Sequence, residues 1–393
     1  MKIKKSFLDT YLIVFLMVAV VLPTFLAKPL ILFFTSLIVL KILFGKDLFL
    51  YSNQKILIFI FLLPGILLSL FFDLKEALRY SVILIIVLGF PYYDFKIRFL
   101  PILITSILIL LYLISSQMLI ATGNQLFIDY REFGYKNEFS YIWNYGIVSN
   151  LIEEILNFGG GVRSGGLYYN PNQLAGIIVL NFFIYNATIQ YQKNINKFNF
   201  FFSILNNLIL VSVSAALLLA ESRTVLITFI IFFFIQYVDI NKLLKFKFRK
   251  EMKKALLILS IVLVLIYESV IRGIVNVDES FYIKFEILIN YINQIKLNQF
   301  FFGGTFDIHF DTEYGMLFGA LGICGLFAFF ILLRLIYKNF LLGKETVIAF
   351  LLMGMGTTLF LNLQKISIIL ILLILLSRLT YLNDLNNKDA KNK

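Results

Sequence analysis

The chain has 393 residues, a mean hydropathy of +0.89 and only 15% charged residues. A soluble protein of this length needs more polar side chains to cover its surface, so the composition excludes that class. The single cysteine, Cys324, and the single histidine, His309, exclude an internal disulfide and the usual Cys/His zinc site. A formal net charge of +12 would favour nucleic-acid binding only if the positive charges gathered on one face of the protein.

Repeated apolar runs near 20 residues long predict one all-α integral membrane domain over residues 1–393. No internal repeat is evident, which disfavours an inverted-repeat transporter. In chain order we expect about twelve membrane helices, at roughly 7–27, 29–44, 56–72, 77–92, 97–120, 173–190, 199–220, 224–238, 255–271, 313–336, 346–362 and 366–381.

The basic residues predict the orientation of these helices. With Lys2, Lys4 and Lys5 in the cytoplasm, most Lys and Arg fall in alternate loops, most densely in DINKLLKFKFRKEMKK (239–254). The positive charge is therefore a topology signal and not a nucleic-acid footprint. Both termini are expected in the cytoplasm, with a disordered tail over 383–393.

Two long loops, about 121–172 and 272–312, fall on the outer side in this topology. Each contains an amphipathic stretch, FSYIWNYGIVSNLIEEILNF (139–158) and FYIKFEILINYINQIKLNQFF (281–301). Helices of this kind lie along the membrane–water interface. Anchoring at the interface and guidance of a substrate both remain open as their role.

The first long loop ends in GGGVRSGGLYYNPNQLAG (159–176). Its glycines allow a tight turn or a close approach to a ligand. Asn170 or Asn172 can cap the following helix, and Pro171 suits its first turn. Backbone N–H groups at that helix start, with Arg163 nearby, would suit a phosphate. An ordinary glycine-rich turn before a capped helix is the alternative interpretation.

A second polar point is LLLAESRTVLIT (217–228), which predicts a tight outer turn between two apolar runs. Arg223 in this turn is either a snorkelling side chain or a ligand contact. A third is the group Asp307, His309, Asp311 and Glu313 immediately before a late span. Packing does not readily explain four titratable groups within seven positions.

The residue types in these three polar segments favour a group-transfer reaction. Arginines can hold a diphosphate, and a carboxylate or imidazole can accept a proton from a hydroxyl group. Together they suit a reaction with a diphosphate leaving group. A proton-coupled transporter could use similar residues, although it would usually place them near the membrane centre.

Four segments in order resemble the O-antigen polymerase and ligase superfamily. VRSGGLYYNPNQLAG (162–176) resembles its Arg-x-x-Gly-x-x-x-Asn-Pro-Asn-x-x-Ala segment, and ESRT (221–224) resembles the turn that follows. NQFFFGG (298–304) resembles the end of its periplasmic helix, and DTEYGMLFGALGICGLF (311–327) resembles the start of a late span.

This resemblance implies a GT-C-like, inverting glycosyltransferase in the bacterial inner membrane. It would act at the outer face on sugars carried by undecaprenyl diphosphate, with no cofactor and no metal. Arg163 and Arg223 match the family arginines that hold the diphosphate. Asp311, His309 and Glu313 are the candidate catalytic acids and bases, and the candidate glycan or acceptor contacts are Tyr168, Asn170, Asn172, Arg272 and Lys284.

One departure favours polymerase over ligase. Ligases carry a histidine eleven positions before the glycine that is Gly322 here, whereas this chain has Asp311 there and His309 two residues earlier. The identity of the base stays open. We therefore expect a polymerase for O-antigen, capsule or exopolysaccharide, with a ligase or a non-enzymatic flippase as alternatives. Expected partners are the lipid-linked oligosaccharide, the bilayer and a chain-length regulator, but no nucleic acid.

Overall fold

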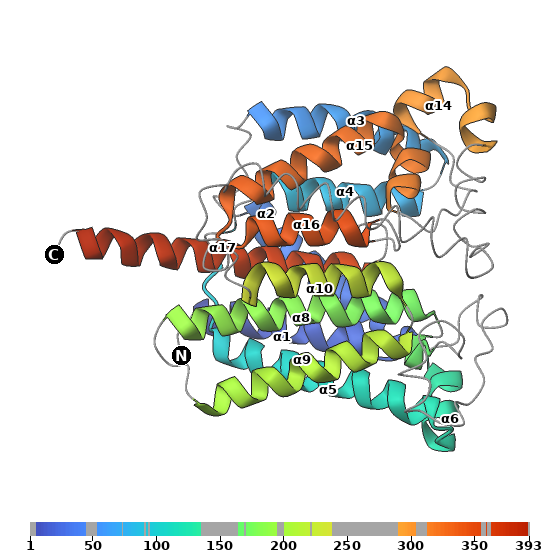
Figure 1. Cartoon of the computed structure of the whole chain (residues 1–393). Coiled ribbons are helices and arrows are strands. Elements are labelled where there is room, and N and C mark those ends of the chain that lie inside the picture. The colour runs from blue at the N-terminus through green and yellow to red at the C-terminus, as the bar shows by residue number, and fades with distance from the viewer. Residues whose placement is uncertain are drawn as a thin grey trace, which may run out of the picture.

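The described part of the chain is an all-helical bundle (Figure 1). The computed structural model describes residues 5–44, 53–72, 74–89, 92, 95–134, 164–168, 170–194, 200–220, 222–237, 290–303, 313–354, 359 and 363–391. Its helices are α1 (Lys5–Val21), α2 (Thr24–Phe44), α3 (Asn53–Phe72), α4 (Leu74–Leu88), α5 (Phe99–Ala121), α6 (Gln125–Gly134), the 3₁₀ turn η1 (Gly166–Tyr168), α8 (Pro171–Asn194), α9 (Phe200–Ala220), α10 (Arg223–Tyr237), α14 (Leu297–Phe302), α15 (Glu313–Asn339), α16 (Gly343–Met353) and α17 (Leu363–Lys391).

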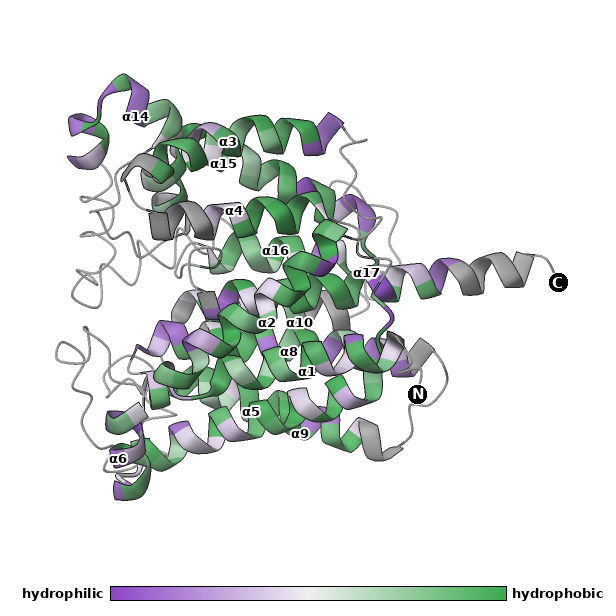
Figure 2. Cartoon of the chain, turned by 180° about the vertical axis from the view of Figure 1, so that it is seen from behind, coloured by the Kyte–Doolittle hydropathy of each residue, from purple (hydrophilic) through white to green (hydrophobic). Residues whose placement is uncertain are grey.

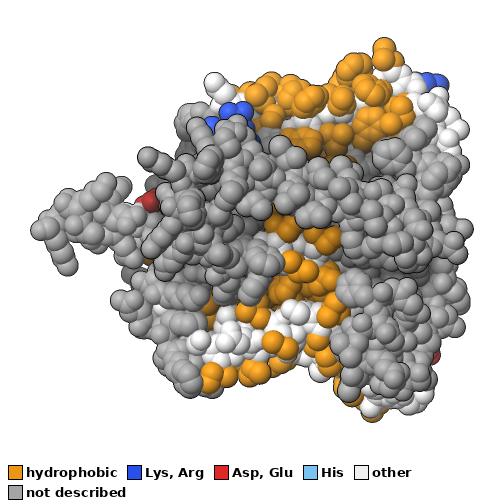
Figure 3. All heavy atoms as spheres, in the orientation of Figure 1, with side chains coloured by type: hydrophobic (Ala, Val, Ile, Leu, Met, Phe, Trp, Pro, Cys, Tyr) orange, Lys and Arg blue, Asp and Glu red, His pale blue; other side chains and the backbone are white. Residues whose placement is uncertain are grey.

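Among the described residues, six helical segments are long and apolar enough to cross a membrane. They are Phe25–Phe44, Phe99–Ala121, Pro171–Gln192, Ser203–Ala220, Tyr314–Asn339 and Gln364–Asp384. Apolar colour runs along the helix bodies in Figure 2. Leu108 of α5 and Val211 of α9 are 61% and 69% exposed, and apolar side chains also cover the flank seen in Figure 3. Such surfaces suit contact with lipid, so the chain is a polytopic membrane protein.

A helix overlaps each predicted membrane range except 255–271, which lies outside the described residues. α16 has 11 residues, which give about 17 Å at 1.5 Å per residue, well short of roughly 30 Å of hydrocarbon. α4 and α10, with 15 residues each, are also short. Twelve complete spans therefore stay a prediction.

The helices lie side by side (Figure 1), and hydrophilic residues gather toward the two ends of the bundle (Figure 2). We name these the Asp9 end and the Tyr168 end. α1 starts at the Asp9 end, and its last turn reaches the Tyr168 end, where the Val20 carbonyl accepts a hydrogen bond from the Tyr168 hydroxyl at 3.2 Å. The beginning of α1 and the end of α17 lie on the same side of the bundle.

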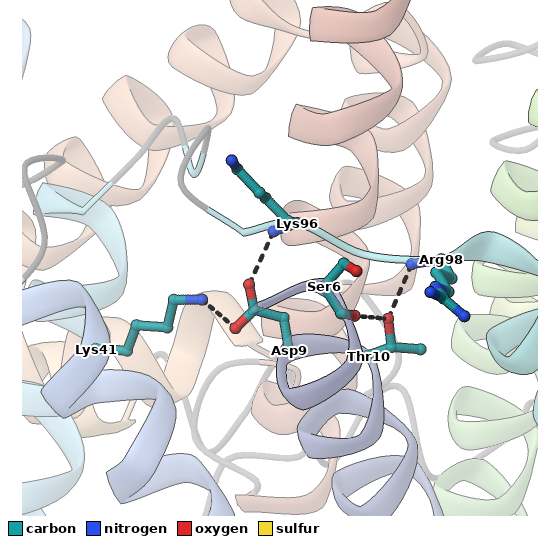
Figure 4. A network of polar contacts seen from close by, with 6 residues as sticks. All are labelled: Ser6, Asp9, Thr10, Lys41, Lys96 and Arg98. Carbon is teal, nitrogen blue, oxygen red and sulfur yellow. Dashed lines mark hydrogen bonds and ion pairs between the residues drawn. The ribbon is translucent and has the colours of Figure 1, made fainter. Parts of the chain in front are cut away.

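At the Asp9 end, a buried carboxylate connects several chain segments (Figure 4). Asp9, 2% exposed, pairs with the ammonium of Lys41 and accepts the Lys96 backbone N–H at 2.9 Å. At the next residue, the Thr10 hydroxyl accepts the Arg98 backbone N–H at 2.9 Å and donates to the Ser6 carbonyl. These bonds hold α1, the end of α2 and the start of α5 together.

α8 is the central helix of one half of the bundle. It packs against α5, α9, α10 and α17, and 89% of the residues in its apolar stretch are buried. At the Tyr168 end, the Gln173 amide donates to Gln364 Oε1 at 3.0 Å, and the Gln364 amide donates to the Val20 carbonyl at 3.2 Å. Side-chain amides therefore link the start of α8, the start of α17 and the end of α1.

The other half contains α3, α4 and α15, with α14 against the first part of α15. α15 is kinked at Gly322, whose φ is +64°. Gly303, which ends α14 with a φ of +74°, lies against the backbone of Ala320 and Leu321, while Gly322 lies against the backbone of Phe301 and Phe302. Glycine at both positions permits the positive φ and this direct contact between backbones.

Two segments differ from the sequence prediction. α17 continues as a helix to Lys391, through most of the tail expected to be disordered over 383–393. Its long apolar part supplies a formed helix from which further turns extend at little cost in nucleation. In the described part of the stretch 281–301, residues 290–294 and 297–301 are helical and 295–296 are not. The Lys296 N–H donates to Gln299 Oε1 there and starts a new helix.

Candidate functional site

The candidate site lies at the Tyr168 end, where α1, α5 and α9 end and α8, α10 and α17 begin. Its centre is the Gln117 junction, which we define as Gln117, Ser164, Ala216 and Leu219. The Ser164 N–H donates to the Leu219 carbonyl at 3.0 Å. The Gln117 amide nitrogen donates to the carbonyls of Ser164 at 3.2 Å and Ala216 at 3.0 Å. Thus the segment before α8 is fastened to the last turn of α9.

Gly166 fits the glycine-rich segment tightly against α5. Its φ is +50°, and a Cβ there would lie 3.3 Å from Cα and Cβ of Gln117 and 3.1 Å from Leu174 Cδ2. A side chain would therefore meet both unfavourable backbone geometry and crowding. A tight turn is present at Gly166, with Gln117 and Leu174 beside it.

Tyr168 lies in η1 and is 4% exposed. Its hydroxyl donates to the Val20 carbonyl at 3.2 Å. Burial raises the pKa of this phenol above its usual range, and the neighbouring Tyr112 and Tyr130 raise it further. Tyr168 is therefore a neutral hydrogen-bond donor that holds η1 to α1, and contact with a glycan stays a prediction for it.

Asn170 is the cap of α8. Its Oδ1 accepts the N–H of Asn172 at 2.9 Å and that of Gln173 at 3.3 Å. Pro171 occupies the first helical position, where its missing N–H would have had no intrahelical partner. Of the two caps that the sequence allows, the structure uses Asn170. Glycan contacts by Asn170 and Asn172 stay predictions.

Several predicted site residues lie outside the described residues. These are Arg163, Arg272, Lys284, His309 and Asp311. Arg223 and Glu313 begin α10 and α15, but their side chains are not described. The Leu219 carbonyl at the junction is four residues before Arg223 in the chain. Ser222, between α9 and α10, is 1% exposed, and its carbonyl accepts the Leu226 N–H at 2.9 Å.

The polar residues of this end that were not predicted as site residues include Gln117, Arg131 and Lys365. Gln117 is fully buried in α5, Arg131 is 8% exposed in α6, and Lys365 is 1% exposed in the first turn of α17. A Cβ on Gly176 of α8 would lie 3.3 Å from Lys365 Nζ. Long polar side chains inside apolar segments are the signal that marks Gln117 and Lys365 in the sequence.

No metal site is evident where the structure can be described, because no three His, Cys, Asp or Glu residues there are grouped to hold an ion. An apolar pocket lies away from the Gln117 junction, between α3, α4 and α15, and includes Ile58, Tyr80 and Leu321 in its lining. Its wall offers little for binding a charged group.

No known protein family, curated protein or solved structure matches the chain.

Proposed function

We propose that the chain is a polysaccharide polymerase of the bacterial inner membrane. It transfers a growing glycan from undecaprenyl diphosphate to a lipid-linked repeat unit at the outer face. The proposal is supported by the all-helical membrane bundle and by the ordered motifs between residues 160 and 328 that resemble O-antigen polymerases. The fold proposed for the whole chain is GT-C-like.

The observation that carries the proposal is the Gln117 junction. Ser164 belongs to the first motif, and Leu219 lies two residues before the second, ESRT (221–224). The hydrogen bond between their backbones, at 3.0 Å, brings two segments that are distant in sequence to one end of the bundle. A diphosphate site made from Arg163 and Arg223 requires this proximity of their segments.

In the proposed reaction, Arg163 and Arg223 stabilise negative charge on the diphosphate as its bond to the sugar C1 breaks. A hydroxyl oxygen of the acceptor sugar forms the new bond to C1 from the opposite face. The hydroxyl proton goes to Asp311, or to His309 with Glu313. Undecaprenyl diphosphate leaves, and the configuration at C1 inverts.

Deletion of the gene tests the proposed function. We expect the deletion strain to carry single repeat units on its surface lipid in place of long chains. Persistence of long chains on undecaprenyl diphosphate, unable to reach their final acceptor, would instead identify a ligase. Repeat units trapped on the inner leaflet would identify a flippase.

Arg163→Ala tests the site within this function. It should abolish or strongly reduce polymerisation while membrane insertion stays normal. The control is Arg98→Ala, at the exposed side chain of an arginine on the Asp9 end, which should leave chain length unchanged. Normal chain length in Arg163→Ala would contradict the proposed diphosphate site.

A further inference from the structure

Gln117 uses both of its amide N–H groups to join segments that are far apart in the chain. Ser164 is 47 residues away and Ala216 is 99 residues away. Other buried hydroxyls of α5 bond locally: the Ser116 hydroxyl donates to the Leu113 carbonyl of its own helix. Gln117 is thus a link between three chain segments, and Ser116 is not.

The link lies at the end of α9, where backbone carbonyls lack intrahelical N–H donors. Leu219 is in the last turn of α9, where helix carbonyls have no intrahelical partner, and Ser164 supplies its N–H. Gln117 then holds the carbonyl of the same Ser164 and that of Ala216, one turn earlier in α9. Among uncharged side chains of this length, only that of glutamine ends in an NH₂ group that can donate two hydrogen bonds.

From this geometry we infer that Gln117 is a positioning residue for the diphosphate site, an inference that rests on the proposed function. Ser164 directly follows Arg163 in the chain, and Leu219 is followed within four residues by Arg223. By fixing Ser164 to the end of α9, Gln117 sets the spacing of the backbone segments that carry the two arginines. It acts on the site through the placement of these two segments.

Two buried polar atoms here support a ligand-binding role for this end. Gln117 Oε1 and Ser222 Oγ lie in side chains that are 0% and 1% exposed, and among the residues that the structure describes neither atom has a hydrogen-bond partner. Buried polar atoms of this kind are uncommon unless a water or a ligand serves them. The junction therefore keeps capacity for hydrogen bonds beyond those that hold it together.

The test uses the purified full chain in lipid nanodiscs, with undecaprenyl diphosphate as the probe. Gln117→Met keeps the length of the side chain and removes both donors, and Gln117→Asn is one methylene shorter and reaches at most one carbonyl. We expect Kd to rise about tenfold in Gln117→Met, which loses two hydrogen bonds, and less in Gln117→Asn. The matched control Ser116→Ala, also fully buried, should bind as the wild type does.

Hydrogen exchange separates positioning from general damage. In Gln117→Met, amide exchange should rise in peptides covering 164–168 and 216–222, while peptides from α3 and α15 keep the wild-type rate. If the Met variant does not fold, the Asn variant is measured in the same way. Unchanged Kd in a folded variant, or unchanged exchange at 164–168, overturns the inference. Failure of the wild type to bind undecaprenyl diphosphate overturns the proposed function instead, and the exchange data still decide whether Gln117 holds Ser164.

Discussion

Tyr168 shows how one buried hydroxyl fixes the start of the candidate site. We expect Tyr168→Phe to lower the free energy of unfolding by about 1 kcal/mol at neutral pH, because the bond to the Val20 carbonyl is lost. The measurement is thermal unfolding of the detergent-solubilised protein. An unchanged melting temperature would show that this hydrogen bond contributes no net stability.

The same phenol predicts a dependence on pH. Its folded-state pKa is raised above the ordinary value of 10.0, so the contribution to stability is full below pH 10 and is lost as pH rises through the folded-state pKa. The stability of the wild type should therefore fall more steeply above pH 10 than that of Tyr168→Phe. Parallel curves for the two proteins between pH 9 and 11 would contradict the assignment.

Asp9 carries a comparable prediction at the other end of the bundle. Asp9→Ala removes the buried carboxylate that pairs with the Lys41 ammonium and accepts the Lys96 N–H, and should cost about 2–3 kcal/mol of stability. Asp129→Ala is the control, because Asp129 is exposed and accepts a hydrogen bond from the Gln125 side chain, four residues earlier in the same helix. The control should change stability by less than about 0.5 kcal/mol. Equal losses in the two variants would contradict the role of Asp9.

Residue roles that depend on local sequence were predictable, and roles that depend on distant partners were not. The capping of α8 by Asn170 follows from Asn-Pro-Asn at a helix start. Gln117 meets Ser164 and Ala216 only after three segments pack together. Asp9 likewise finds Lys41 at a distance of 32 residues in the chain. Neither pair leaves a periodic pattern in the sequence.

At the scale of elements, the docking of α14 on α15 depends on two glycines with positive φ. Gly303→Ala should cost more than about 2 kcal/mol, since a positive φ alone costs roughly 1–2 kcal/mol and the added Cβ meets the backbone of Ala320. Gly123→Ala, in the turn after α5 with a φ of +78°, measures the cost of the φ alone. Amide exchange in peptides covering 297–302 should rise in Gly303→Ala. Exchange equal to the wild type would show that α14 docks without this contact.

Long apolar helices were predictable because a stretch of apolar residues near 20 long has few other solutions in a bilayer. α6 and the kink in α15 were not. α6 has only ten residues and lies within the loop predicted over 121–172, and Gly322 is one of four glycines spaced along α15. Only the arrival of Phe301 and Phe302 selects Gly322 as the point where the helix breaks.

For the whole molecule, the proposed topology places the Tyr168 end outside and the Asp9 end in the cytoplasm. The lone cysteine makes this testable after Cys324→Ala, by adding one cysteine at a time. Leu126→Cys, at a position 72% exposed in α6, should react with an impermeant maleimide in spheroplasts, and Lys96→Cys should react only after lysis. The reverse pattern would place the candidate site in the cytoplasm and rule out an outer-face polymerase.

The most direct test of the account is a double-mutant cycle on undecaprenyl diphosphate binding, with Arg163→Ala, Arg223→Ala and the two changes combined. If both guanidinium groups hold one diphosphate, each single change weakens binding at least tenfold, and the combined loss differs from the sum of the single losses by about 1 kcal/mol or more. Losses that add within about 0.5 kcal/mol, or no loss at all, would contradict a shared site.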